Sequence, residues 1–145
     1  MIFQERMQAM IRGDLDPPPV AFTVGMRLVS VGDGEAVFEL DADPERHANP
    51  MGTVHGGILC DIADGAMGCA YASLLGEGES FTTLELKINF LKPVRAGRLA
   101  ARARVVKSGR TVGLVECDVE DEGGSLVARA SSTCLTLRGE AASGR

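Results

Sequence analysis

The chain has 145 residues, a formal net charge of −5, four cysteines and no tryptophan. Its length suits one domain of ordinary size, and its negative charge and few aromatic residues argue against non-specific nucleic-acid binding. The cysteines, at positions 60, 69, 117 and 134, show none of the spacings of zinc sites or redox motifs. We therefore expect free thiols, no metal and no cofactor.

We expect no targeting or membrane segment. Glu5 and Arg6 interrupt the N-terminal apolar residues, whereas a secretory signal has an uninterrupted apolar run. The longest weakly polar run, Gly56 to Leu75, contains Asp61 and Asp64, which a membrane span would exclude. The sequence thus predicts a cytoplasmic protein that binds neither membrane nor nucleic acid.

The chain begins with the pattern of a short amphipathic helix. Phe3, Met7 and Met10 recur at helical spacing, and the prolines of the DPPP run at residues 16–19 would end such a helix. We expect a single domain over residues 1–145, with this helix and its proline-rich turn at 1–20 and a flexible tail at 139–145.

Six segments have the pattern of β-strands separated by turn residues such as GDG, SGR and DEGG. Arg102 and Arg104 share one face of their strand, and acidic residues share one face of the next, so we expect charge pairs on a solvent-facing side of the sheet. The predicted strands cover residues 26–31, 35–40, 81–91, 99–107, 112–120 and 126–137.

One long helix is predicted from about Gly56 to Leu75, between the first two strands and the other four. Asp61 and Asp64 are its only charges, and an acid on a face of small residues predicts a cleft or an interface. The apolar arc expected to face the sheet comprises Ile58, Leu59, Ile62, Ala66, Cys69 and Ala70. The residues expected around Asp64, on the other face, are Gly57, Cys60, Met67, Gly68 and Tyr71.

The sequence HGG, from His55 to Gly57, stands where this helix begins. The first N–H groups of a helix lack intrahelical partners and lie at the positive end of its dipole, so Gly56 and Gly57 can offer donors to an oxyanion. Asp64 follows Gly56 by eight residues, or about 12 Å of helix, too far for both to act on one carbonyl. Donor and acid would therefore come from two subunits of a homodimer with antiparallel helices.

Four features of the chain together carry a resemblance to a known family: the order of elements, Asn49 with the HGG that follows it, the aspartate of DIAD, and the strand FTTLELKINFLKP. In these features the chain resembles the hot-dog-fold acyl-CoA thioesterases of the phenylacetyl-CoA thioesterase type, in the 4-hydroxybenzoyl-CoA thioesterase superfamily. The resemblance covers about residues 22–137. It implies an α+β fold in which a curved antiparallel β-sheet wraps a long central helix, and dimers that pair into tetramers.

The resemblance also implies roles for individual residues. Gly56 would donate its N–H to the oxyanion, and Asn49 would help to polarise the thioester carbonyl. Asp64 of the opposite subunit would activate water or attack directly. Thr83, with Thr82 as the alternative, would supply the hydroxyl beside this acid, and His55 would lie near the leaving sulfur.

A basic stretch suits the phosphates of coenzyme A. Residues 91–115 hold seven Lys or Arg and no acid, including Lys92, Arg95 and Arg98 at turns. The resemblance places the nucleotide at the loop formed by Lys107, Ser108, Gly109 and Arg110, and Gly57 and Thr82 among the other substrate-binding residues.

The sequence therefore predicts hydrolysis of an acyl-CoA, with an aromatic or medium-chain acyl group, to the free acid and CoA. It does not decide whether Asp64 acts as a general base or as a nucleophile. Two alternatives stay open: a hot-dog dehydratase or hydratase of acyl thioesters, and a non-catalytic acyl-CoA-binding protein.

Overall fold

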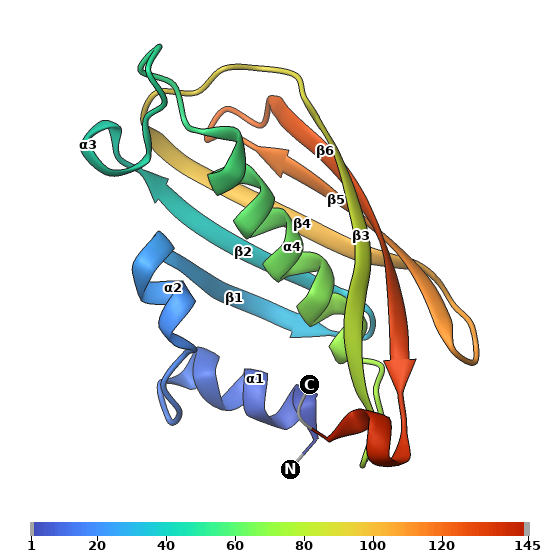
Figure 1. The fold of residues 1–145 in the computed structure, drawn as a ribbon. Coiled ribbons are helices and arrows are strands. Elements are labelled where there is room, and N and C mark those ends of the chain that lie inside the picture. Colours follow the sequence, from blue (N-terminus) through green and yellow to red (C-terminus); the bar gives the residue numbers. More distant parts are fainter. Residues whose placement is uncertain (1, 144–145) are drawn as a thin grey trace.

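The computed structural model describes residues 2–143. One antiparallel sheet, in the order β1-β2-β4-β5-β6-β3, curves around helix α4, Gly56–Ala72 (Figure 1). The strands are Met26–Gly32 (β1), Glu35–Ala42 (β2), Ser80–Phe90 (β3), Gly97–Ser108 (β4), Val112–Glu120 (β5) and Leu126–Leu137 (β6). The predicted α+β hot-dog architecture is confirmed, and each expected strand is present.

The core lies between α4 and the concave face of the sheet. Ile62, Ala66 and Ala70 of the predicted apolar arc have no exposed surface. Small side chains on this helix allow a close approach to the sheet, which removes the apolar side chains from water. The arc therefore faces the sheet as expected, with Ile58 and Cys69 at its half-buried margin.

The face around Asp64 is narrower than the sequence suggested. Met67 and Tyr71 were expected on that face, but both are buried in the core. The Tyr71 ring meets Phe81 edge-on at 5.8 Å, and a Cβ at Gly113 of β5 would lie 2.3 Å from the same ring. The prediction was wrong because β3 and β5 wrap the second half of α4 and cover more of its circumference than a flat sheet would.

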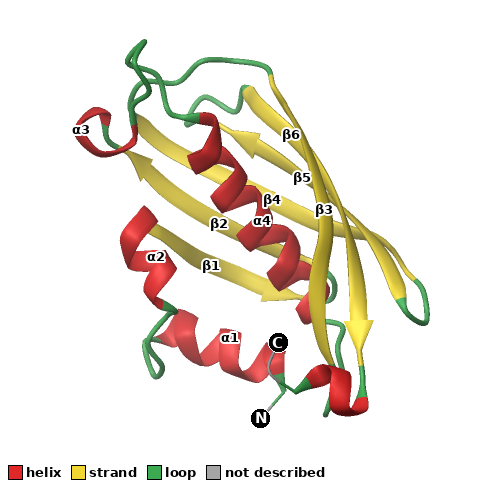
Figure 2. Ribbon diagram, in the orientation of Figure 1, coloured by secondary structure: helices red, strands yellow, loops and turns green. Residues whose placement is uncertain are grey.

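Two helices precede the sheet, where one was expected (Figure 2). Helix α1, Phe3–Arg12, ends at Gly13, whose φ of 82° is left-handed, so this glycine rather than the DPPP run stops the helix. The prolines instead start α2, Pro19–Val24, because proline suits the first position of a helix. Met7 of α1 is buried, and the Gln8 amide donates to the Val31 carbonyl of β1 at 2.7 Å.

Two other short helices were not predicted. Helix α3, Pro44–His47, follows β2, and a 3-10 helix, Gly139–Ala142 (η1), lies in the tail that was expected to be flexible. Residues 144–145 of that tail lie outside the described residues. Neither segment shows a hydrophobic repeat long enough to indicate a helix.

The outer face of the sheet carries the expected charge pairs. Arg104 contacts Glu116 at 2.6 Å, and Arg129 contacts Asp118 at 2.7 Å. These pairs are exposed, so each contributes little to stability. In the part of the chain from residue 2 to residue 143, no helix is long and apolar enough to cross a membrane.

Strand β3 forms one edge of the sheet and, within residues 2–143, pairs only with β6. It is 11 residues long, and its side chains Leu84 and Phe90 are 56% and 55% exposed. The opposite edge strand, β1, is covered by α1 through Met7 and Gln8. A long uncovered edge with apolar side chains is a surface on which another strand can pair.

Candidate active site

The start of α4 offers one free backbone donor rather than two. His55 is the N-cap residue, and its Nδ1 accepts a hydrogen bond from the Gly57 N–H at 3.0 Å. The donor expected at Gly57 is therefore occupied. The Gly56 N–H forms no hydrogen bond within residues 2–143, and it lies at the positive end of the helix dipole.

The absence of a side chain at Gly56 keeps this donor accessible. A Cβ at this position would lie 2.9 Å from the Phe90 ring. Phe90 is half-exposed at the end of β3, so its ring already borders the space in front of the donor. Glycine thus allows an oxygen atom to approach the start of the helix closely.

Asn49 organises the loop that leads to this donor. Its Oδ1 accepts from the N–H groups of Met51 and Thr53 at 3.0 and 3.1 Å, and its Nδ2 donates to the Thr53 hydroxyl at 2.8 Å. These bonds leave one N–H of the amide available. Asn49 can therefore polarise a carbonyl only through that remaining hydrogen atom.

A cavity of about 520 Å³ opens in front of the Gly56 donor, and we call it the helix-start cavity. Its rim is apolar and open, since Met51 is 71% exposed and Phe90 is 55% exposed. An apolar rim of this kind is the surface that a partner commonly covers. The residues that line the cavity include Asn49, Met51, His55, Gly56, Leu59 and Phe90.

Asp64 opens on a different cavity, of about 470 Å³, which lies between α1 and α4 and which we call the α1–α4 cavity. Burial among protein atoms raises the pKa of Asp64, although part of its side chain is exposed; a hydrogen bond from Thr83 lowers the pKa, and the charge of Asp61 raises it. Desolvation also raises the pKa of Asp61. A carboxylate with a raised pKa is a better general base than a free one.

The two cavities share no lining residue. Gly56 and Asp64 are eight residues apart on one helix, about 12 Å at the usual rise. The described chain therefore does not bring the donor and the acid together around one carbonyl. Each cavity holds only part of the predicted constellation.

The structure distinguishes the two candidate threonines. Thr83 lines the α1–α4 cavity beside Asp64, and Thr82 does not. Neighbouring residues of a strand point to opposite faces, so only one of the two can face the helix. Thr83 is therefore the hydroxyl that faces the acid.

The segment from Lys107 to Arg110 comprises the last two residues of β4 and the first two of the turn to β5, and it is exposed at the end of the sheet away from the start of α4 (Figure 1). Within residues 2–143, Lys107 and Arg110 form no ion pair, whereas Lys92 pairs with Asp121. Arg98 is likewise paired, with carboxylates of β2. Arg95 also lacks an ion pair in the described part of the chain, but its guanidinium donates to the Met51 carbonyl at 3.2 Å. Lys107 and Arg110 are therefore the cations of the basic stretch that are neither paired nor bound to the backbone in this region.

Sequence reasoning missed the contribution of helix α1 to the site. Phe3, Met7 and Met10 line the α1–α4 cavity together with Asp64. Their helical spacing indicated a buried face, but no pattern in the sequence indicates that this face packs against the acid of α4. Within residues 2–143, no three His, Cys, Asp or Glu side chains are grouped closely enough to hold a metal ion.

Comparison with known protein families identifies the family to which the chain belongs. The sequence model of the thioesterase superfamily matches residues 51–128, which include the start of α4, Asp64 and β3. The chain belongs to the thioesterase superfamily. It is a thioester hydrolase. The helix-start cavity lies almost wholly on matched residues, whereas the α1–α4 cavity combines matched residues of α4 and β3 with N-terminal residues outside the match.

Relatives and solved structures agree with this assignment. The 1,4-dihydroxy-2-naphthoyl-CoA hydrolase of Listeria monocytogenes is 31% identical over 100 residues, which are 69% of this chain and 80% of that protein. A phenylacetic acid degradation-related protein from Ralstonia eutropha has a TM-score of 0.80 and 34% identity, over 90% of this chain and 98% of that one. A thioesterase family protein from Silicibacter pomeroyi has a TM-score of 0.80 and 31% identity, over 92% and 99%.

Proposed function

We propose that this thioesterase hydrolyses an acyl-CoA to the free acid and CoA at composite sites of a homodimer. The observation that carries the proposal is that Gly56 and Asp64 open on separate cavities of one chain. A twofold axis between antiparallel α4 helices would bring the donor of each subunit to the acid of the other. Each dimer would then hold two equivalent sites.

The free edge of β3 supports this mode of association. The edge strand is 11 residues long and pairs on one side only. Two copies of such an edge can pair antiparallel about a twofold axis, which would also cover Leu84 and Phe90. Because Phe90 borders the helix-start cavity, the same contact would close this cavity. Pairing of dimers into tetramers stays a prediction from the resemblance.

The chemistry follows from the groups at the two cavities. The Gly56 N–H would hold the carbonyl oxygen, while Asp64 of the partner subunit takes a proton from water as the water oxygen attacks the carbonyl carbon. The tetrahedral intermediate then breaks its C–S bond, and the proton passes to the thiolate to give CoA and the acid. Direct attack by the carboxylate, through an anhydride that water hydrolyses, is the other route to the same products.

Two further side chains would position these groups. Thr83 lines the same cavity as Asp64, and its hydroxyl lowers the pKa of that carboxyl, so it would orient the carboxylate by a hydrogen bond. Because His55 accepts a hydrogen bond at Nδ1, its neutral ring carries the proton on Nε2. That N–H can then be offered to the leaving sulfur.

The exposed segment Lys107, Ser108, Gly109 and Arg110 would bind the nucleotide of CoA. Its two cations are without an ion pair in the described part of the chain, and exposed cations attract phosphate at modest ionic strength. This role requires a substrate that reaches from this segment to the reacting carbonyl, and CoA is a long thiol of this kind.

Release of free thiol from acyl-CoA substrates tests the proposed function. The wild-type protein should release CoA, which a chromogenic thiol reagent detects. The Asp64→Asn substitution should remove most of this activity. Formation of an enoyl thioester without thiol release would indicate a hydratase or dehydratase instead. Tight binding of acyl-CoA without turnover would indicate a non-catalytic binding protein.

A further inference from the structure

We infer that the α1–α4 cavity binds the acyl group of the substrate, and that α1 and the proline-rich segment before α2 form the wall that selects an uncharged hydrocarbon chain or ring. The inference rests on the proposed function, since it places the acyl group next to Asp64. It adds a specificity role for the N-terminal residues, which lie outside the matched part of the family at 51–128.

The cavity has the size and the surface of a small-molecule site. Its volume is about 470 Å³, within the range of about 300–1,000 Å³ typical of such sites. Its apolar lining comes from α1, Pro17 and Pro18 before α2, α2 itself, α4, β1, β2 and β3, and includes Phe3, Met7, Met10, Met26, Phe38 and Phe81. Methionine side chains are flexible and polarisable, so this lining can adapt to either an alkyl chain or an aromatic ring.

The reacting groups lie in the same cavity. Asp64 and Thr83 line it together with Met10 and Phe81. A thioester whose carbonyl carbon is within reach of Asp64 would therefore have its hydrocarbon part directed beneath α1. No second apolar space is needed to accommodate the acyl group.

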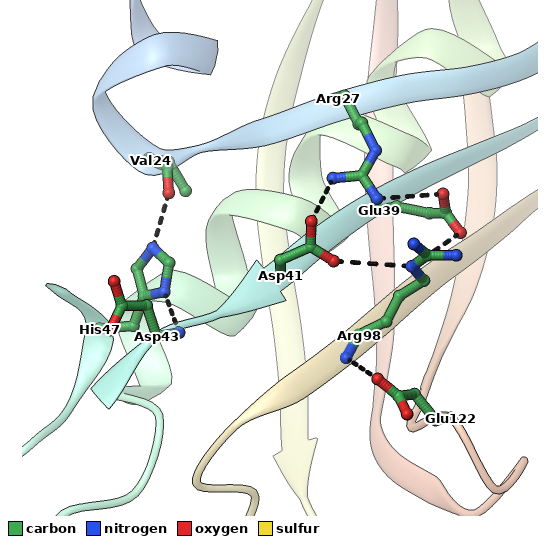
Figure 3. A network of polar contacts seen from close by, with 8 residues as sticks. All are labelled: Val24, Arg27, Glu39, Asp41, Asp43, His47, Arg98 and Glu122. Atoms are coloured by element: carbon green, nitrogen blue, oxygen red, sulfur yellow. Dashed lines mark hydrogen bonds and ion pairs between the residues drawn. The ribbon is translucent and has the colours of Figure 1, made fainter. Parts of the chain in front are cut away.

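Charge excludes an acidic acyl group. Asp61 and Asp64 are the carboxylates of the cavity, and Arg27 is its one cation among the lining residues. Arg27 is bound by Asp41 at 3.1 Å and by Glu39 at 3.4 Å (Figure 3). A carboxylate at the far end of the acyl group would therefore meet negative charge and no free cation. Desolvation in the cavity would add to the free-energy cost of this repulsion.

The wall of the cavity is held in place at both ends. At the α1 end, Phe3 packs edge-on against Phe81 with ring centroids 6.1 Å apart. At the α2 end, the buried His47 ring contacts the Val24 carbonyl at 2.7 Å, and Arg46 donates to the Thr23 carbonyl at 2.8 Å (Figure 3 shows the His47 contact). Basic side chains commonly hold the last carbonyls of a helix in this way. The wall is thus a fixed part of the fold.

Methyl NMR of the methionines tests the location without any turnover. We would titrate protein labelled with ¹³C at the methionine methyls with 2-decanone, an uncharged ketone. The methyl signals of Met7, Met10 and Met26 should shift, because these residues line the cavity. Those of Met51, in the helix-start cavity, and Met67, in the core, should not. Shifts confined to Met51, or no shifts at all, would overturn the inference.

Kinetics test the role in specificity, with a matched control on the same helix. Met10→Trp fills the cavity, whereas Ile11→Trp changes a neighbouring half-buried residue that does not line it. Met10→Trp should lower the ratio of kcat/KM for octanoyl-CoA to that for acetyl-CoA by about tenfold or more. Ile11→Trp should leave this ratio unchanged. Equal ratios in both variants would contradict the inference.

Two further measurements keep the result interpretable. Met10→Ala, which cannot overpack the cavity, should move the preference towards longer chains, so a folding defect in the Trp variant does not prevent the test. Wild-type protein should hydrolyse octanoyl-CoA and phenylacetyl-CoA in preference to glutaryl-CoA, and the reverse preference would overturn the inference. Wild-type inactivity on every acyl-CoA would refute the proposed function, while the ketone titration would still decide whether the cavity binds hydrocarbon.

Discussion

Replacing Gly56 with proline removes the proposed oxyanion donor and adds a side chain whose Cβ would lie 2.9 Å from the Phe90 ring. Proline lacks the N–H and is well suited to the first position of a helix, which Gly56 occupies. The preceding residue, His55, already has the extended backbone that a following proline requires, with φ −61° and ψ 138°. The helix should therefore form in the variant, and far-ultraviolet circular dichroism would verify this.

The size of the effect can be separated from crowding by a matched control. Gly56→Ala introduces the same Cβ, 2.9 Å from the Phe90 ring before that ring moves, but keeps the N–H. Loss of one oxyanion donor lowers kcat by about 10² to 10³. We therefore expect the proline variant to release thiol about 10² times more slowly than the alanine variant at saturating acyl-CoA. Equal kcat values for the two folded variants would refute the role of this N–H.

Other predictions concern the acid, the nucleotide site and the wall of the cavity. Asp64→Asn should lower kcat by about 10² to 10⁴, whereas Asp61→Asn should lose only a helix-dipole contact of about 0.3–1 kcal/mol. A general base must be ionised, so kcat/KM should rise with pH as the Asp64 carboxyl loses its proton. Because burial raises the pKa of Asp64, this rise should occur at a higher pH than for an ordinary aspartate. Replacing Lys107 and Arg110 together with alanine should raise KM for acyl-CoA, but not for short thioesters without the nucleotide. His47→Ala leaves the buried Val24 carbonyl and the partly buried Asp43 N–H without their partner, so denaturant titration should show a loss of about 1–3 kcal/mol.

Each of these predictions has an outcome that contradicts it. If Asp61→Asn lost activity while Asp64→Asn kept it, the catalytic acid would be wrongly assigned. Equal increases in KM for substrates with and without the nucleotide would give Lys107 and Arg110 a structural role. Unchanged stability of His47→Ala would show that this ring does not hold α2 to the rest of the fold.

Stability offers an independent check on Asp64. A raised pKa in the folded state means that folding favours the protonated acid, so the ionised form destabilises the fold at pH values above that pKa. This penalty disappears as the pH falls through the folded-state pKa. Asp64→Asn should therefore not lower the free energy of unfolding at neutral pH, although it lowers activity, and a large loss of stability would assign the residue a structural role.

The strands and the central helix were predictable because their determinants are local. Alternating apolar residues bounded by turn residues gave β1 to β6, and the arc around Ile62 gave the buried face of α4. Helices α2 and α3 were missed because each is too short to show a repeat. The burial of Tyr71 depends on how far the sheet curves, which periodicity within one helix does not determine.

The candidate site was predictable only in part, because some of its features depend on tertiary packing. The position of Gly56 at a helix start and its separation from Asp64 follow from helical geometry. The occupation of the Gly57 N–H depends on the side-chain conformation of His55, and the lining of the α1–α4 cavity depends on where α1 packs. Both are tertiary features that residue spacing does not encode.

Mixed dimers of Gly56→Pro and Asp64→Asn test the central claim most directly. If each site combines the donor of one subunit with the acid of the other, every heterodimer holds one intact site and one doubly altered site. Random mixing at equal amounts should then restore about one quarter of the wild-type activity from two nearly inactive parents. No recovery, with heterodimers demonstrated by native mass spectrometry, would show that donor and acid act within one chain.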